Sequence, residues 1–413
     1  MNTSIENYDY FLPPELVAQY PLPQRDAARL LVLHRGSGEM IHTSFGDLPQ
    51  YLDAGDLLVV NDTRVFPARL HGAKASGGKI ELLLHHLPEA EAKGGEIGKF
   101  GGGGQGPVAQ AFQPVRTPVP GPTPPPPTPC MDGGAGNEGG AGLRARQALR
   151  RAQRPAPPSN SALARATYRG RLRQGQELVF GAGLRAEVIS LPRPGLAEVR
   201  FWSLNGGDPA QSVLEQGEVP LPPYIHRPPE EADRQGYQTV YAHHVGAIAC
   251  PTAGLHFSDA VLKDLARRGI ETAAVTLHVG PGTFMPVREN DYTRHWLEPE
   301  YFELSQAAAQ RLNQAREKGQ RIVAVGTTST RVLEYGAGPR GFQPQTGWCD
   351  LFIHPGYTFK AVDRLVTNFH LPKSTLLLLV SAFAGRDLIM RAYEEAVQEK
   401  YRFYSYGDCM LIL

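Results

Sequence analysis

Hydrophobic positions between residues 246 and 284 switch from the spacing of a strand to that of a helix and back. An apolar run ends at Ile248, a helix capped by Ser258 is predicted over 259–268, and a β-rich run follows over 272–277. His256 follows the first predicted strand and His278 follows the second. Because ligands of open α/β sheets collect at the carboxyl ends of the strands, we expect both imidazoles at one edge of a sheet. Either histidine taken alone is equally compatible with a partly buried imidazole that only satisfies its own hydrogen bonds.

Polar side chains also follow two other predicted strands, at 56–61 and 321–325, and occupy a later loop at 368–374. A further strand is predicted at 351–353, the segment 362–369 leads into that loop, and helices are predicted over 306–318, 330–335, 376–383 and 386–400. The polar residues at these places are Asn61, Asp62, Thr63 and Arg64; Thr327, Thr328 and Ser329; and Asn368 and His370. A carboxylate, a guanidinium and hydroxyls suit a charged nucleoside, although turns and helix caps use the same residue types.

The pattern changes after residue 67 to short alternating runs separated by glycine-rich turns. Strands are predicted over 68–72, 79–85, 178–180, 186–191 and 197–202, as in a small antiparallel barrel. From 88 to about 166 the chain is rich in glycine, proline and alanine, so we expect a disordered insertion in the barrel. Arginines gather in its later half, from Arg144 to Arg154, and are followed by others from Arg165 to Arg173; such a run is typical either of a solvated arm or of a segment that attracts phosphate.

Charge and cysteine content narrow the classes of function. The 413 residues carry a formal net charge of +1, so any nucleic-acid surface is local. The four cysteines are far apart and form no CxxC or Cys/His pair, which argues against a disulfide framework and a structural zinc site. No signal peptide or membrane-spanning run is apparent, and we expect a cytoplasmic protein that does not bind a membrane.

Several familiar catalytic motifs do not occur. The sequence has no G-x-S-x-G elbow, no H-E-x-x-H and no Walker A motif, and its two G-x-G-x-x-G matches, at Gly101 and Gly336, do not follow predicted strands. The adjacent pairs His85–His86 and His243–His244 have no Asp, Glu or Cys at ligand spacing. We therefore expect no metal site.

The strand-end motifs closely resemble those of the S-adenosylmethionine:tRNA ribosyltransferase-isomerase family of queuosine biosynthesis. The resemblance covers the chain from residue 8 to 413 apart from the insertion, and its longest run is GDLLVVNDTRVFPAR at 55–69. The other matching stretches are 221–224, 237–241, 249–257, 276–286, 324–329, 367–375 and 401–412. The resemblance implies a three-layer α/β domain formed by 1–66 and 223–413, with a small antiparallel β-barrel domain inserted at 67–222.

What the family does supplies a specific expectation for the reaction. Its members move the ribosyl group of S-adenosylmethionine, a co-substrate, onto 7-aminomethyl-7-deazaguanine at the wobble position of tRNAs with GUN-type anticodons. The products are epoxyqueuosine in tRNA, adenine and methionine. The chemistry needs a base, an acid for the leaving adenine and a pocket for a cation, and we expect no further cofactor. The resemblance also suggests a monomer.

Transferred to this chain, the resemblance points to the strand-end residues. His256 or His278 is the expected general base or acid, since a free imidazole titrates near neutral pH, and the sequence does not decide between them. Asp62 is the expected partner of a cationic group, and Arg64 that of a carboxylate or phosphate. The remaining residues expected to bind substrate are Thr252, Thr327, Thr328, Asn368 and His370, the last also a candidate for acid–base catalysis.

Two positions depart from the family pattern. Where the family has His-x-Met-His-x-Glu, this chain has His295 and Glu300 at the ends but Glu298 in place of the second histidine. The family's Pro-Ser-Arg/Lys segment in the barrel is replaced by the stretch 167–170. These changes leave an alternative open, a catalytically degraded member that still binds tRNA. A different S-adenosylmethionine-dependent transferase, which would yield S-adenosylhomocysteine, is a third reading.

Overall fold

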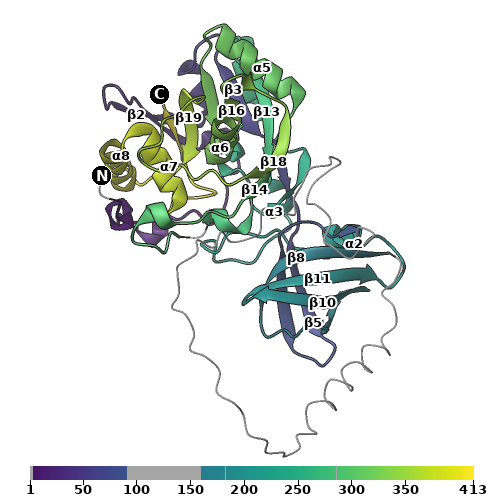
Figure 1. Cartoon of the computed structure of the whole chain (residues 1–413). Helices are drawn as coiled ribbons and strands as arrows, with labels where there is room; N and C mark the ends of the chain where they lie inside the picture. Colours follow the sequence, from purple (N-terminus) through teal and green to yellow (C-terminus); the bar gives the residue numbers. More distant parts are fainter. Residues whose placement is uncertain (1–2, 91–159, 182, 285) are drawn as a thin grey trace, which may run out of the picture.

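The computed structural model describes residues 3–90, 160–181, 183–284 and 286–413, and these form a mixed sheet and a separate barrel (Figure 1). The sheet has nine strands in the order β18-β14-β13-β3-β15-β19-β20-β1-β2. Its strands are β1 (Arg29–Leu33), β2 (Met40–Ser44), β3 (Leu57–Asn61), β13 (Glu271–Leu277), β14 (Glu300–Leu304), β15 (Ile322–Val325), β18 (Gln345–Cys349), β19 (Arg364–Asn368) and β20 (Cys409–Ile412).

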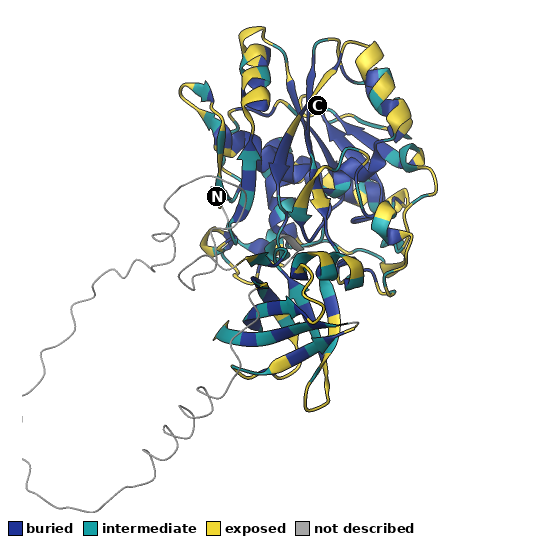
Figure 2. Cartoon of the chain, turned by 90° about the vertical axis from the view of Figure 1, so that its right-hand side faces the viewer, coloured by how far each residue is buried: buried dark blue, intermediate teal, exposed yellow. Residues whose placement is uncertain are grey.

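The four neighbouring strands β13, β3, β15 and β19 are mutually parallel, so their carboxyl ends lie at one edge of the sheet. The strands on either side of this group are antiparallel to it. In β3, β15 and β19, alternate residues enter different hydrophobic cores. On β3, Leu57 and Val59 lie in one core while Leu58 and Val60 lie in the other. Burial on both faces explains the uninterrupted apolar runs of these strands (Figure 2).

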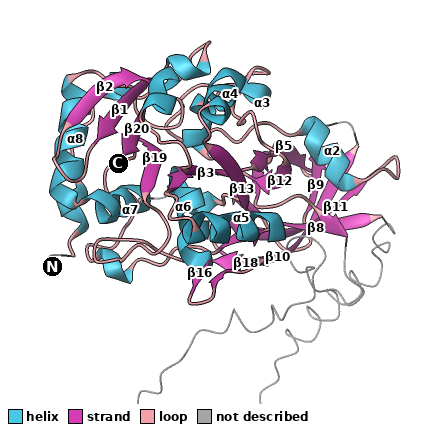
Figure 3. Ribbon diagram, turned by 90° about the horizontal axis from the view of Figure 1, so that it is seen from above, coloured by secondary structure: helices cyan, strands magenta, loops and turns pink. Residues whose placement is uncertain are grey.

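Helices packed against the sheet (Figure 3) supply further side chains to the two cores. One core takes residues from α5 (Gln306–Glu317), α6 (Gly326–Gly336), α7 (Thr375–Ala384) and α8 (Arg386–Gln398), and the other from α4 (Asp259–Arg267) and the 3₁₀ helix η4 (Phe45–Gln50). Ser258, Ser305 and Ser374 cap α4, α5 and α7 through their side-chain oxygens. The predicted helices at 259–268, 306–318, 376–383 and 386–400 are confirmed to within two residues at each end.

Helix α6 begins earlier than the sequence suggests. The prediction placed a loop at 326–329 and a helix at 330–335, whereas α6 starts at Gly326 directly after β15. Gly326 makes this possible because its φ of +85° turns the chain sharply without a Cβ penalty. Thr327 and Thr328 therefore lie in the first turn of a helix.

The second unit is a closed antiparallel barrel of six strands, which lies below the sheet in Figure 1. Pairing of β8 with β11 closes the ring, whose strands are β5 (Arg69–Lys74), β6 (Lys79–Leu84), β8 (Ser161–Arg169), β9 (Glu177–Phe180), β10 (Leu184–Arg193) and β11 (Leu196–Ser203). Helix α2 (Pro209–Gln216) packs Val213 into the barrel core. Ile248, which lies outside the barrel strands, also belongs to this core. The mixed α/β class with an antiparallel barrel is thus confirmed.

The predicted limits of the disordered insertion were wrong at both ends. Residues 89–90 form the short strand β7, and 161–166 belong to β8, between β6 and β11 in the ring. The alanines that lowered the β-propensity of this segment face large partners, with Ala162 opposite Phe201 and Ala164 opposite Val199. Residues 91–159, including the arginines from 144 to 154, lie outside the described residues, and the domain boundaries at 66/67 and 222/223 stay predictions.

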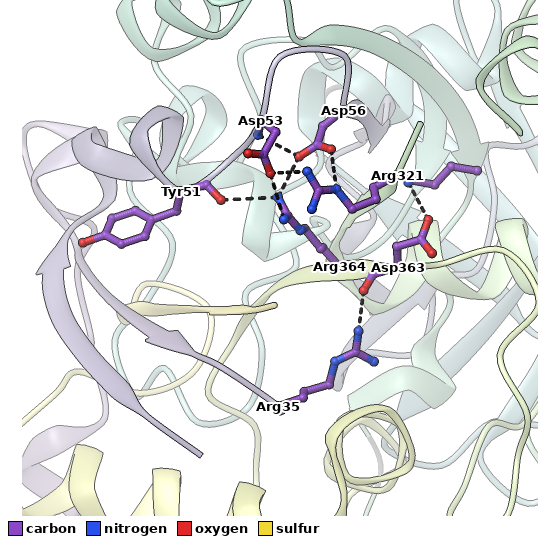
Figure 4. A network of polar contacts seen from close by, with 8 residues as sticks. Arg35, Tyr51, Asp53, Asp56, Arg321, Asp363 and Arg364 are labelled. Atoms are coloured by element: carbon purple, nitrogen blue, oxygen red, sulfur yellow. Dashed lines mark hydrogen bonds and ion pairs between the residues drawn. The ribbon is translucent and has the colours of Figure 1, made fainter. Parts of the chain in front are cut away.

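An ion-pair network ties together the amino-terminal edge of the sheet (Figure 4). Asp56, just before β3, accepts hydrogen bonds from Arg321 Nε at 2.9 Å and Arg364 Nη1 at 2.7 Å. These arginines introduce β15 and β19, so one buried carboxylate fixes three adjacent strands. Asp53 contacts both guanidinium groups on the more exposed side.

Candidate functional site at the carboxyl edge of the sheet

Asn61, the last residue of β3, uses its side chain to join neighbouring elements. Its Nδ2 donates to Leu277 O at 3.0 Å and Thr328 Oγ1 at 3.1 Å, while its Oδ1 accepts from the backbone of Thr63 and Leu277. The buried amide therefore holds β13, β3 and the start of α6 together. All its polar atoms have partners, so Asn61 shapes the edge rather than offering groups to a ligand.

Asp62 projects from this edge and meets a histidine that the sequence had not linked to it. Its Oδ1 accepts a hydrogen bond from Thr276 Oγ1 at 2.6 Å, and its Oδ2 lies 3.7 Å from His244 Nε2. Asp62 O also accepts from the backbone N–H groups of His243 and His244. No carboxylate stands at ligand spacing beside the 243–244 pair in the sequence; Asp62 reaches His244 because β12 (His244–Ala247) lies parallel to β4 (Thr63–Val65).

His278 lies directly beyond β13 and contacts Thr63. Its Nδ1 is 2.7 Å from Thr63 Oγ1, and its ring stacks on Tyr301 with centroids 5.7 Å apart. The ring also rests against Gly246, where a Cβ would come within 2.5 Å of Nε2. Burial, with a smaller contribution from His244, lowers the pKa of His278 to about 4.

His256 reaches the same edge by another route than predicted. The strand before it, β12, pairs with β4 alone in a two-stranded sheet, and His256 ends the 3₁₀ helix η5 (Thr252–His256). The expectation of equivalent strand ends in one sheet was therefore wrong for His256. Its Nε2 nevertheless lies 3.2 Å from Nδ2 of Asn368, the last residue of β19. Burial, then the positive charges of Arg402 and Arg25, lower its pKa to about 3.

The other residues expected at the site are spread along this edge. His370 is buried, with Nε2 2.8 Å from Thr367 Oγ1, and burial lowers its pKa to about 3. Thr327 is buried in the first turn of α6, Thr252 opens η5 half-buried, and Arg64 is exposed on β4. The structure brings Asp62, Thr63 and His278 together, and separately His256 with Asn368.

Two consequences follow for the chemistry. With strands about 4.8 Å apart, β13 and β19 are separated by three spacings, so the two groups lie roughly 14 Å apart along the edge. At that distance the two groups can contact different parts of the bound substrates, but they cannot share a proton. The expectation that His256 and His278 titrate near neutral pH does not hold, since both imidazoles are neutral at pH 7. A neutral imidazole accepts a proton but does not supply one.

The described residues give little support for a metal site, a disulfide or a membrane-spanning helix. In those ranges no group of three or more His, Cys, Asp or Glu side chains is arranged around a possible metal ion. Cys250, Cys349 and Cys409 are buried free thiols. The helices of the same ranges are too short or too polar to span a bilayer. A cavity of about 350 Å³ adjoins His256.

The sequence of this chain is similar to that of known proteins. The family model described as "Queuosine biosynthesis protein" matches residues 5–105 and 139–412. The chain belongs to the queuosine biosynthesis protein family. This match confirms the resemblance seen in the strand-end motifs. The matched residues include the run from Gly55 to Arg69, which carries Asn61 and Asp62.

Close relatives within the queuosine family match almost end to end. A protein of Syntrophotalea carbinolica is 41% identical over 411 residues and one of Symbiobacterium thermophilum 43% identical over 412, with 99% of each chain covered. Both are named S-adenosylmethionine:tRNA ribosyltransferase-isomerase. A crystal structure of S-adenosylmethionine tRNA ribosyltransferase from Thermotoga maritima is 32% identical, covers 98% of this chain and all of that one, and aligns with a TM-score of 0.48, too low to carry an argument about the fold.

Proposed function

We propose that this protein transfers and isomerises the ribosyl group of S-adenosylmethionine onto 7-aminomethyl-7-deazaguanine in the wobble position of tRNA, releasing adenine and methionine. Near-complete alignment with relatives that carry this enzyme name supports the proposal. The single structural observation that carries it is the pair of side-chain hydrogen bonds at the carboxyl edge, one from Thr276 to Asp62 and one between Thr63 and His278.

Within this reaction His278 acts as the base and Asp62 as the anion beside developing positive charge. The neutral imidazole of His278 accepts a proton, while Thr63 Oγ1 fixes its ring at 2.7 Å. Asp62 is only 15% exposed and is already held by Thr276, so its carboxylate is oriented before substrate arrives. His244 lies next to Asp62 and has a side chain that is 48% exposed, so this part of the site is open to solvent.

The proposal also covers the location, oligomeric state, cofactor requirement and architecture of the enzyme. The enzyme works as a cytoplasmic monomer on tRNA with a GUN-type anticodon, and needs no metal or organic cofactor besides its co-substrate. The α/β unit has three layers, because α5 to α8 contribute to the core on one face of the sheet and α4 to the core on the other. Thr327, Thr328 and Arg64 line the substrate path.

The proposal is tested by incubating the protein with S-adenosylmethionine and an anticodon stem-loop carrying the deazaguanine precursor. Adenine and methionine are expected in equal amounts, together with epoxyqueuosine in the RNA. Release of S-adenosylhomocysteine would instead identify a different transferase. Binding of the stem-loop without adenine release would leave the catalytically degraded member, the alternative raised by Glu298.

A further inference from the structure

A cavity of about 350 Å³ opens beside His256 at the carboxyl edge of β19. Its walls come from segments far apart in sequence: residues 21–28, 235–236, 255–256 and 405–407. Small-molecule sites occupy roughly 300–1,000 Å³. The cavity therefore has room for a nucleoside-sized ligand but not for an RNA helix.

One wall of this cavity carries a cation without a carboxylate partner. Arg25 donates from Nη1 to Gln238 O at 2.7 Å and from Nη2 to Gln235 O at 3.1 Å, bonds that hold the guanidinium in place. Among the described residues, no Asp or Glu oxygen forms an ion pair with it. An oriented guanidinium whose charge is not neutralised by the chain is suited to a carboxylate ligand.

A second guanidinium reinforces the positive potential near His256. Arg402 Nη1 is buried and, within the described ranges, has no hydrogen-bond partner. Its charge and that of Arg25 both lower the pKa of His256, which places both groups close to this imidazole. Arg402 is not among the residues that line the cavity, so it adds positive potential there rather than a contact to the ligand.

A hydroxyl and apolar side chains complete the lining. Ser405 lies on the cavity wall, and Pro21, Leu22 and Pro23 form an apolar side. Asn368 is outside the lining, but its Nδ2 contacts the lining His256, and its Oδ1 is buried without a partner in the described part of the chain. A ligand with a carboxylate for Arg25 and a flat apolar ring for the proline and leucine side would complement this lining.

We propose that this cavity binds S-adenosylmethionine, with the carboxylate of its methionine part against Arg25. The assignment rests on the proposed function, which supplies the ligand, and adds the place where that ligand lies. It also orients the co-substrate along the edge: its methionine part lies at the end at His256 and Asn368, and its ribosyl group, like the RNA base, lies toward the end at His278 and Asp62. An RNA phosphate is the other source of an anion at Arg25, and the cavity's volume favours the small molecule.

The test compares S-adenosylmethionine with decarboxylated S-adenosylmethionine, which lacks only the carboxylate. Affinities without RNA are measured by titration calorimetry for the wild type, Arg25→Gln and Arg35→Gln. Arg35 is the matched control, since it also donates to three backbone carbonyls but lies at the opposite edge of the sheet, next to Asp363 (Figure 4). Arg25→Gln is expected to weaken S-adenosylmethionine about 10- to 100-fold and the decarboxylated form less than about threefold. Arg35→Gln should change neither.

Equal loss of both ligands in Arg25→Gln, or loss of neither, overturns the assignment. Should that variant fail to fold, Leu22→Trp fills the cavity from its apolar side without removing a hydrogen bond. It is expected to raise the KM for S-adenosylmethionine at least about tenfold at unchanged stem-loop affinity, and unchanged KM refutes the proposal. If Arg25→Gln binds the stem-loop more weakly but binds S-adenosylmethionine normally, the cavity binds an RNA phosphate instead, and the assignment is overturned. If the wild type releases adenine while these variants behave normally, the cavity assignment fails and the proposed function stands.

Discussion

Replacing Gly246 by Ala is the sharpest test of the role of His278, because it moves the imidazole without altering its chemistry. The added Cβ would lie 2.5 Å from Nε2, 2.6 Å from Cδ2 and 2.7 Å from Cε1 of the ring. Carbon contacts are optimal at about 3.5 Å or more, so the ring must move by roughly 1 Å. Its 2.7 Å hydrogen bond to Thr63 would then stretch beyond hydrogen-bonding distance.

The expected kinetic effect follows from that displacement. A misplacement of about 1 Å at a catalytic group costs on the order of 10²-fold in rate, or about 2.7 kcal/mol of transition-state stabilisation. We therefore expect kcat for adenine release to fall about 100-fold, with a smaller change in the KM for S-adenosylmethionine. Overpacking will also destabilise the fold by about 1–3 kcal/mol, so rates are compared well below the unfolding temperature.

A matched glycine serves as the control for this experiment. Gly36 lies in the turn after β1, where an added methyl group would meet no atom within 4 Å, and its φ is not positive. Gly36→Ala should therefore leave kcat and stability unchanged. The decisive result is a crystal structure of Gly246→Ala paired with its kinetics. A displaced ring with kcat within about threefold of the wild type would show that His278 is not the base.

Three further outcomes are expected. Asp56→Asn should lower the free energy of unfolding by about 2–3 kcal/mol in urea titrations, since Arg321 and Arg364 lose a buried anion, while kcat stays normal because Asp56 lies at the opposite edge. Because folding lowers the pKa of His278 from 6.5 to about 4, the unfolded state binds more protons than the folded state between these pH values, and the free energy of unfolding should fall as the pH drops from about 6.5 to 4. His278→Gln should reduce the slope of this pH dependence by up to about 1.4 kcal/mol per pH unit. An unchanged slope would mean that the ring is protonated in the folded protein. Ser374→Ala removes the cap of α7 and should cost about 1 kcal/mol, measured by thermal unfolding; no loss would mean that water replaces the cap.

Local sequence determined most elements of this protein. Ser258, Ser374 and the helical spacing of apolar residues gave α4, α7 and α8 nearly to the residue, because capping and amphipathicity act over one or two turns. Apolar runs likewise gave β3, β13 and β15, since strands buried on both faces need no alternation. Polar residues at the ends of parallel strands correctly marked one edge of the sheet.

Tertiary structure decided what local patterns do not contain. Strand β8 was hidden by its alanines, whose burial depends on large partners across the barrel, and β20 was not recognised in the tail although it lies between β19 and β1. Pairing of β12 with β4 brought His244 to Asp62, and burial moved the pKa of His278 away from neutrality. The cavity at Arg25 joins segments from both ends of the chain. Desolvation and long-range pairing depend on which surfaces meet, and a chain specifies those only when it is folded.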